Sequence, residues 1–204
     1  MSAAPEWTGR EFAGHDFRDA DLSRLHTERV VFDDCDFTGA DLGESVHRGS
    51  AFRNCRFERA SLWHSQFVGC SMLGSVFVQC RMRPLVFDEV DFTLAGLGGA
   101  DLRSVDLSGC RFREANLVET DLRKAVLRGA DLTGARTIGT RLDEADLRGA
   151  RVDPTLWTTA SLTGTRIDIA QALMYAAAHG LRLDGESDSE QITPAANRVR
   201  RRPN

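Results

Sequence analysis

Residues 51–70 read AFRNCRFERASLWHSQFVGC, and every fifth position carries a large apolar side chain: Phe52, Phe57, Leu62 and Phe67. The same step of five continues without a break from residue 12 to residue 167. It gives 32 positions, of which 29 are apolar, and it includes all 11 phenylalanines of the chain. The polar exceptions are Thr27, His47 and Thr137. An internal repeat of five residues therefore decides the fold.

A second series, of small residues, lies two positions before the large ones and includes Ala40, Cys55, Ala100 and Ala130. In an extended segment, residues two apart point the same way, so both series face inward. The other two residues of each five turn the chain. Glycine is frequent at the second of them, where we expect a corner without room for a side chain. These glycines are Gly14, Gly39, Gly109, Gly129 and Gly149.

Each five is then one side and one corner, and four fives close a square coil of twenty residues. The segment predicts an all-β solenoid of about eight coils, stacked at the strand spacing of about 4.8 Å. Units such as Ala130-Asp131-Leu132-Thr133-Gly134 resemble the pentapeptide-repeat family, and the resemblance implies a right-handed quadrilateral β-helix. Pro84 falls at a corner near the middle of the chain, where we expect it to bend or bulge the rod.

The repeat also sets the expected domain boundaries. Residues 1–9 form an N-terminal lead-in or cap, 10–167 the β-helix, 168–183 a short C-terminal α-helix and 184–204 a disordered tail. Asp168 and Gln171 fit a capping box, and Gly180 ends the helix. We expect this helix to cap the last coil and to join two copies in a homodimer, through Ile169, Leu173, Met174, Ala177 and Leu181. The alternative is a helix folded entirely over its own coil.

All five cysteines belong to the small inward series, so we interpret them as small buried residues rather than as metal ligands or disulfides. His47 occupies a large inward position and is expected to be a satisfied core histidine, whereas His64 sits at a corner. Acids and bases at outward positions have no pocket that excludes water, so no catalytic residue is predicted. The sequence predicts no enzyme activity, no metal site and no cofactor.

Aspartates recur at the outward position just before a large residue, and with Asp143 they are the candidate partner-binding residues: Asp91, Asp101, Asp106, Asp121, Asp131, Asp143 and Asp146. Successive coils place such carboxylates in columns, although Arg103 and Arg123 are interspersed among them. A net charge of -4 is too small to identify a partner by itself.

The segments CSMLGSVFVQCRMRPL and VDPTLWTTASL closely resemble the fluoroquinolone-resistance branch of the pentapeptide-repeat family, which is related to the Qnr group. That resemblance implies a dimeric rod that imitates B-form DNA and occupies the DNA-binding surface of DNA gyrase. It would inhibit supercoiling and protect gyrase from fluoroquinolones, with no direct contact to nucleic acid. Qnr proteins carry loops that project from the coils, and we predict none here.

A second hypothesis is a structural or adaptor solenoid that binds another protein through exposed apolar corners. Its candidate residues are Trp63, His64, Val68 and Leu73. The salt dependence of partner binding distinguishes the two hypotheses, because binding through mimicked charge weakens steeply as ionic strength rises. The N-terminus has no export signal and no apolar run reaches the roughly 20 residues of a membrane helix, so we expect a cytoplasmic protein with no membrane contact.

Overall fold

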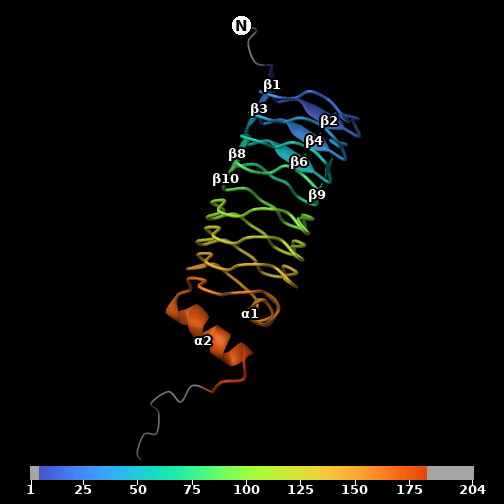
Figure 1. Cartoon of the computed structure of the whole chain (residues 1–204). Coiled ribbons are helices and arrows are strands. Elements are labelled where there is room, and N and C mark those ends of the chain that lie inside the picture. Colours follow the sequence, from blue (N-terminus) through green and yellow to red (C-terminus); the bar gives the residue numbers. More distant parts are fainter. Residues whose placement is uncertain (1–4, 183–204) are drawn as a thin grey trace, which may run out of the picture.

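The backbone of each coil pairs in parallel with the coil twenty residues further along the chain. The structure is a computed structural model that describes residues 5–182. It is an elongated stack of coils that ends in two short helices (Figure 1). The strands are β1 (Glu6–Thr8), β2 (Glu11–Ala13), β3 (His26–Glu28), β4 (Val31–Asp33), β5 (Val46–Arg48), β6 (Ala51–Arg53), β7 (Arg56–Glu58), β8 (Gln66–Val68), β9 (Val76–Val78) and β10 (Val86–Asp88). The helices are α1 (Leu156–Thr159) and α2 (Ile169–Ala178).

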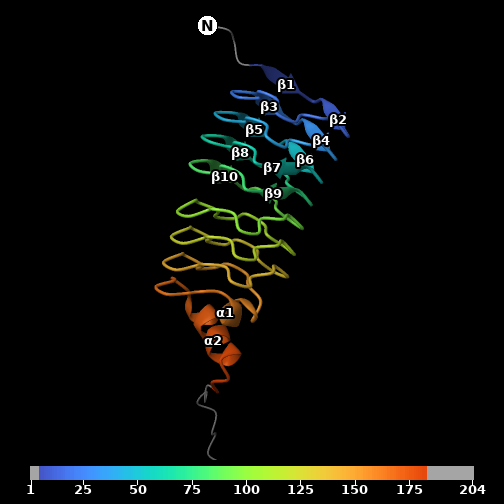
Figure 2. The ribbon, with the colours of Figure 1, turned by 45° about the vertical axis from the view of Figure 1, so that its right-hand side comes forward.

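Regular strands cover about the first four turns, in sheets ordered β1-β3-β5-β8-β10, β2-β4-β6 and β7-β9. The coils continue in the same stack toward the C-terminus (Figure 2), where single parallel bridges keep the same register. One side forms an unbroken ladder of eight rungs, at residues 11, 31, 51, 71, 91, 111, 131 and 151. The predicted solenoid of about eight coils is confirmed. The ladder already begins at Glu6, within the segment predicted as a lead-in.

The large inward side chains stack on their counterparts in the neighbouring coils. The rings of Phe17, Phe37, Phe57 and Phe77 form one column, with successive centroids 5.0, 4.9 and 4.8 Å apart. These separations match the rise of one coil, about 4.8 Å, so the hydrogen-bond ladder and the ring stacking satisfy the same spacing. Leucines continue the columns toward the C-terminal end and are equally buried. The core is therefore a set of parallel side-chain columns.

The cysteines complete the core instead of forming a site. Cys55 Sγ lies 3.5 Å from the Phe32 carbonyl of the preceding coil, and Cys70 Sγ lies 3.4 Å from that of His47. Thr140 Oγ1 donates the equivalent bond to the Leu117 carbonyl. All five thiols are free; four are buried as expected, whereas Cys80 is only half-buried, and burial raises the pKa of Cys55 to about 12. A thiol at the small position therefore serves as a weak donor to the coil before it.

His47 is fully buried, as expected for a satisfied core histidine. Its Nδ1 lies 2.7 Å from Thr27 Oγ1 and its Nε2 lies 2.9 Å from Ser45 Oγ. Its ring stacks on Phe67 at 4.7 Å, so it takes the place of a phenylalanine in the column. Burial lowers the pKa of His47 to about 3, and the imidazole stays neutral in the folded protein.

The corners differ from the expectation that they exclude side chains. Sixteen residues other than glycine have positive φ there, among them Lys124 and Leu94. Space is open around Gly14, Gly109 and Gly129, so the prediction of a crowded corner is wrong at those positions. At Gly39 a Cβ atom would lie 2.1 Å from Asp19 Oδ1, which is the end of a side chain that can turn away, and 3.8 Å from the nearest backbone atom. Most corners point their side chains into solvent, because the core lies on the opposite side of the backbone.

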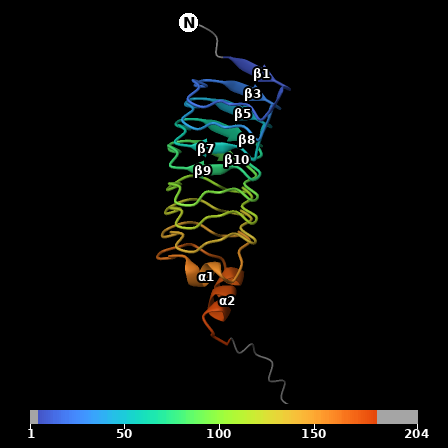
Figure 3. The ribbon, with the colours of Figure 1, turned by 90° about the vertical axis from the view of Figure 1, so that its right-hand side faces the viewer.

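One glutamine of α2 closes the C-terminal end of the solenoid. Gln171 Nε2 donates to the carbonyls of Leu147 and Ala150, at 2.7 and 2.8 Å. In the preceding coil the carbonyl equivalent to that of Ala150, at Ala130, accepts from the backbone N–H of Arg151 in the following coil, so Gln171 replaces this missing bond. It also forms the predicted capping box with Asp168. The short helix α1, which the five-residue pattern did not predict, lies beside α2 at this end (Figure 3). The predicted tail, 184–204, lies outside the described residues.

His47 gives a pH prediction. The pKa of His47 is about 3 when folded and about 6.5 when exposed, so the unfolded state binds the extra proton as pH falls below 6.5. The associated stability is complete above pH 6.5 and decreases toward pH 3. Between pH 6.5 and 5 the free energy of unfolding of the natural protein should fall by about 2 kcal/mol relative to His47→Phe. Urea titrations at several pH values measure this difference, and parallel pH curves would contradict it.

The terminal cap gives a second prediction. Gln171→Ala leaves the Ala150 carbonyl without its donor, removes the second of the two donors to the Leu147 carbonyl, and should lower the free energy of unfolding by about 2 kcal/mol. Gln171→Glu is the matched variant, because glutamate preserves the capping box but donates nothing to the carbonyls. Chemical denaturation should find both variants destabilised. Full recovery in the glutamate variant would mean that only the helix cap matters.

Candidate partner-binding surface

Each aspartate at the outward position stabilises the corner that follows it with a hydrogen bond from its side chain. The Oδ1 atom accepts a hydrogen bond from the backbone N–H two residues later, with N···O distances of 3.0 to 3.1 Å, in Asp91, Asp106 and Asp131. Asn116 makes the same contact with Val118 at 3.2 Å. Since an uncharged amide closes the turn equally well, the turn does not require a negative charge. The carboxylate charge is therefore available for other interactions.

The structure spreads the predicted carboxylates over several sides of the solenoid. Asp101 and Asp121 face each other one coil apart on one side. Asp106 and Asp146 lie two coils apart on the next side, and Asp91 and Asp131 two coils apart on the one after. Asp143 follows the bridge at Arg141, at a corner of the first side. The seven residues do not form one cluster.

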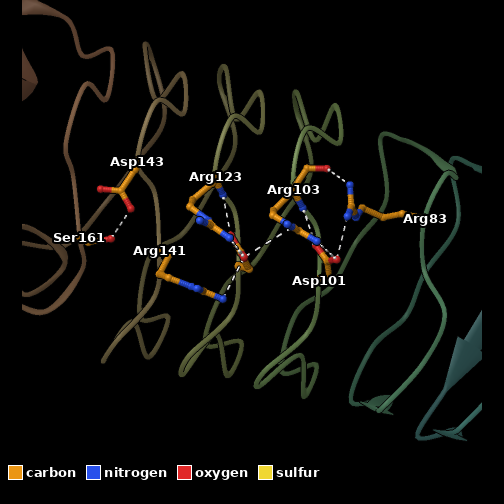
Figure 4. A network of polar contacts seen from close by, with 8 residues as sticks. Arg83, Asp101, Arg103, Arg123, Arg141, Asp143 and Ser161 are labelled. Carbon is orange, nitrogen blue, oxygen red and sulfur yellow. Dashed lines mark hydrogen bonds and ion pairs between the residues drawn. The ribbon is translucent and has the colours of Figure 1, made fainter.

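Arginines cover several of these carboxylates. Asp121 Oδ2 lies 3.6, 2.7 and 2.9 Å from Arg103, Arg123 and Arg141, and its side chain is only 8% exposed. Figure 4 shows this network continuing through Asp101 to Arg83. Hydrogen bonds from Arg123 hold the pKa of Asp121 below its usual value, so the carboxylate stays ionised but neutralised by its neighbours.

Asp146 is covered in the same way. It contacts Arg128 and Arg148 at 2.7 Å each and is also 8% exposed. The prediction that all seven carboxylates are displayed to solvent is wrong for Asp121 and Asp146. The sequence contained only part of the signal for this, because Asp121-Leu122-Arg123 and Asp146-Leu147-Arg148 share one spacing, but Asp101-Leu102-Arg103 shares it too and Asp101 is 45% exposed. Residues two apart lie on the same face of an extended segment, so the guanidinium reaches the carboxylate.

Asp106 and Asp143 differ from the covered residues. Within residues 5–182 neither of them makes an ion pair with lysine or arginine. Asp106 is exposed and binds only the hydroxyl and amide of Ser108, at 2.6 and 3.0 Å. Asp143 accepts from Ser161 Oγ at 2.7 Å and from Thr163 N–H at 2.9 Å. Among the seven predicted carboxylates, these two are the ones whose negative charge no basic side chain of the described residues compensates in an ion pair.

The second candidate surface is the outer face of α2. Ile169 is 82% exposed and Leu181 62%, while Leu173 and Met174 are 49% and 38% exposed. Ala177 is exposed as well. The helix turns Gln171 toward its own coil and the predicted dimer residues away from it. This arrangement contradicts a helix folded entirely over its own coil.

The apolar corners of the adaptor hypothesis are less exposed than expected. Trp63 is half-buried beneath the guanidinium of Arg81, whose Cζ lies 4.9 Å from the ring centre. Val68 and Leu73 are half-buried too, and only His64 is exposed. The prediction of an exposed apolar surface at these corners is therefore wrong. The arginine was available to cover Trp63 because it lies in the following coil.

In the described part of the chain, no three histidine, cysteine, aspartate or glutamate side chains gather in a group that could hold a metal ion. None of the helices between residues 5 and 182 is both long and apolar enough to cross a membrane.

A parallel solenoid with a five-residue side and a side-chain-filled core defines the class of quadrilateral repeat proteins. Two family models, both described as pentapeptide repeats, match the chain over residues 12–46 with 110–149 and over residues 32–76. Together they cover just over half of it. The chain belongs to the pentapeptide-repeat family.

The chain is also similar to individual relatives. It is 69% identical over 104 residues to pentapeptide repeat protein MfpA of Mycobacterium tuberculosis, covering 51% of this chain and 57% of that protein. It is 68% identical over 59 residues to MfpA of Mycolicibacterium smegmatis, covering 29% and 31%. The chain thus matches little more than half the length of the first relative and less of the second.

Among solved structures, that of trypsin-treated QnrB1, described as a plasmid-mediated fluoroquinolone resistance protein, matches with a TM-score of 0.57. The match covers 88% of this chain and 100% of that chain at 19% identity. At this identity the likeness shows a shared fold.

Proposed function

We propose that the protein is a non-enzymatic DNA mimic that binds DNA gyrase, inhibits its supercoiling and protects it from fluoroquinolones. The observation that carries the proposal is the 69% identity to MfpA, in the family branch whose resemblance implies this activity. The rod shape supports it. A coil of twenty residues has a perimeter of at most about 66 Å, so the cross-section is of the order of a DNA duplex.

The distribution of charge refines the proposal. Carboxylates already paired with two or three arginines add little net field, whereas unpaired ones act at full strength within a Debye length of about 10 Å. We therefore assign the larger part of the attraction to Asp106 and Asp143, and a smaller part to Asp91, Asp101 and Asp131. Asp121 and Asp146 then act as structural ion pairs that stiffen the rod. A gyrase partner also implies the cytoplasmic location expected from the sequence.

A homodimer joined through α2 belongs to the same proposal. The exposed side chains of Ile169, Leu173, Met174, Ala177 and Leu181 would face the same residues of a second copy around a two-fold axis. Burial of such side chains contributes about 1.5–3 kcal/mol each. Joining two rods at their C-terminal ends would double the length of the imitated duplex.

Neutralisation of charge tests the mimicry. Asp106→Asn with Asp143→Asn removes two charges while each amide keeps an acceptor oxygen, at residue 106 for the turn, as Asn116 does naturally, and at residue 143 for the Thr163 N–H of the following coil. We expect the concentration needed for half-inhibition of gyrase supercoiling to rise about tenfold, since two exposed charge pairs contribute up to about 1 kcal/mol each.

The matched control for this experiment is Asp21→Asn. Asp21 binds the amide and hydroxyl of Ser23 at 3.0 and 2.6 Å, as Asp106 binds Ser108, but it lies near the opposite end of the rod. Inhibition by the control should be unchanged. Undiminished inhibition by the double variant, or binding to gyrase that ignores ionic strength, would refute the electrostatic account.

The dimer is tested by Leu173→Glu, which places a charge in the centre of the proposed interface. Sedimentation equilibrium at micromolar concentration should find the natural protein dimeric and the variant monomeric, because a buried unpaired carboxylate costs several kcal/mol. Ile138→Glu, at an exposed position of a coil, is the control and should stay dimeric. A natural protein that sediments as a monomer would eliminate the dimer.

A further inference from the structure

Exposed apolar side chains of the coils gather on one side of the rod, the side that carries β9. Between residues 5 and 167 five large apolar side chains are exposed, and only Val86 belongs to another side. The other four, which lie on this side or at its corner, are Val76, Val78, Leu94 and Ile138. We call the uncharged outward positions of this side the apolar strip: Val76, Val78, Gly96, Gly98, Asn116, Val118 and Ile138.

The lack of charge is local to these four coils. In the first three coils the same outward positions carry Asp16, Arg18, Asp36, Arg56 and Glu58. The change has a structural cost, because the valine at position 76 and the glycine at position 96 cannot make the side-chain hydrogen bond with which aspartates close the corners elsewhere. The apolar strip therefore gives up a stabilising contact, which points to a role for its exposed surface.

The helix α2 directs the chain to the foot of the apolar strip. The short helix α1 takes the place of this side in the last coil, because the N–H of Gly139 donates to the Thr159 carbonyl at 2.9 Å. His179, the C-cap residue of α2, lines one hollow together with Thr158 of α1. Figure 1 shows α2 crossing the end of the rod toward the side of β9 and α1. The chain thus continues into residues 183–204 from the foot of the strip.

The sequence after α2 contains one uncharged stretch of matching length. Residues 191–197 read QITPAAN and stand between four carboxylates in residues 184–190 and four arginines in residues 198–202. We call residues 191–197 the uncharged segment. The eight residues that connect it to Arg182 span up to about 26 Å when extended. Val78, the most distant rung of the strip, lies four coils from Thr158, or about 19 Å. The uncharged segment can therefore reach every rung.

The size of the apolar strip decides between this segment and a separate molecule. Four rungs cover about 14 Å along the rod, and one side of a coil is about 10 Å wide. A stable complex between separate proteins buries about 800 Å² on each partner, several times this area. A tethered segment is present at an effective concentration in the millimolar range, so a contact with a dissociation constant of about 1 mM suffices.

Charge at the border of the strip is consistent with an uncharged occupant. Glu114 and Glu119 stand at the two corners beside Val118, and Arg136 follows below. An acidic segment would meet the two glutamates, and a basic segment would meet the arginine. Residues 191–197 carry neither charge, and Ile192 is their largest apolar side chain.

We propose that the uncharged segment docks on the apolar strip of its own chain, with Ile192 packed against Val78, Val118 or Ile138. This inference does not rest on the proposed gyrase binding or on the dimer, because it concerns another side of the rod. The docked segment shields the exposed valines and isoleucine from water. A partner that binds this side must first displace it.

Photocrosslinking in the full-length protein tests the contact. The substitution Ile192→p-benzoylphenylalanine places a photoreactive group in the uncharged segment, and mass spectrometry locates its crosslinks after irradiation. We expect crosslinks within one chain, to the strip between residues 76 and 138. Adding Val78→Glu with Ile138→Glu should lower their yield about threefold, since two apolar contacts are replaced by charges.

Two controls accompany this experiment. Val86→Glu changes the exposed valine of another side and should leave the yield unchanged. The same photoreactive group at Ser187, in the acidic stretch, should reach the strip less often. The proposal is overturned if the crosslinks lie mainly outside the strip, if they join two copies, or if the strip variant and the Val86 control lose equal yield. Circular dichroism of each variant verifies that the coils remain folded.

Discussion

Residues on a side of the rod pair through the backbone with residues twenty positions further along the chain, and this hydrogen-bond ladder constrains every other feature of the molecule. Because each coil must lie about 4.8 Å from the next, a side chain in the core meets its own counterparts above and below at that spacing, in addition to the neighbouring columns of its own coil. Phenylalanine satisfies this condition by face-to-face stacking, as in the column from Phe17 to Phe77. A polar residue such as His47 is tolerated because Thr27 of the preceding coil and Ser45 of its own coil supply hydrogen-bond partners. The ladder thus converts a one-dimensional pattern into a packed core.

The same constraint organises the surface into columns. Each outward position is followed by its equivalent one coil later, so charges that are twenty residues apart in sequence become neighbours. Asp121 consequently gathers arginines from its own coil and from both adjacent coils. Ion pairs thus cover some of the acidic side chains, whereas others within residues 5–182, such as Asp106, make none. A partner that recognises negative charge would contact the unpaired carboxylates first.

At the ends of the rod and where the ladder is interrupted, backbone carbonyls need hydrogen-bond donors from side chains. Gln171 supplies amide donors to the carbonyls of the last coil, and this anchors α2 so that its apolar face turns outward. At Pro84, where within residues 5–182 no parallel bridge joins residues 81 and 101 or residues 86 and 106, the guanidinium of Arg83 reaches across the gap. At the C-terminal end the interrupted repeat coincides with the exposed apolar face of α2. In a solenoid, features that serve association arise most readily where a rung is missing, because elsewhere the backbone is fully occupied.

The sequence by itself determined the solenoid, its number of coils, the buried role of the cysteines and of His47, and the capping helix at Asp168. These follow from periodicity and local capping, which act within five to twenty residues and can be read along the chain. Only the tertiary structure decided which carboxylates remain open. Asp101 and Asp121 are both followed by leucine and arginine in the sequence, yet the Asp121 side chain is 8% exposed beneath arginines of its own and both adjacent coils, whereas that of Asp101 is 45% exposed. The tolerance of side chains at corners and the gap beside Pro84 were likewise decided by contacts between coils, where the long side chains of one rung reach the next.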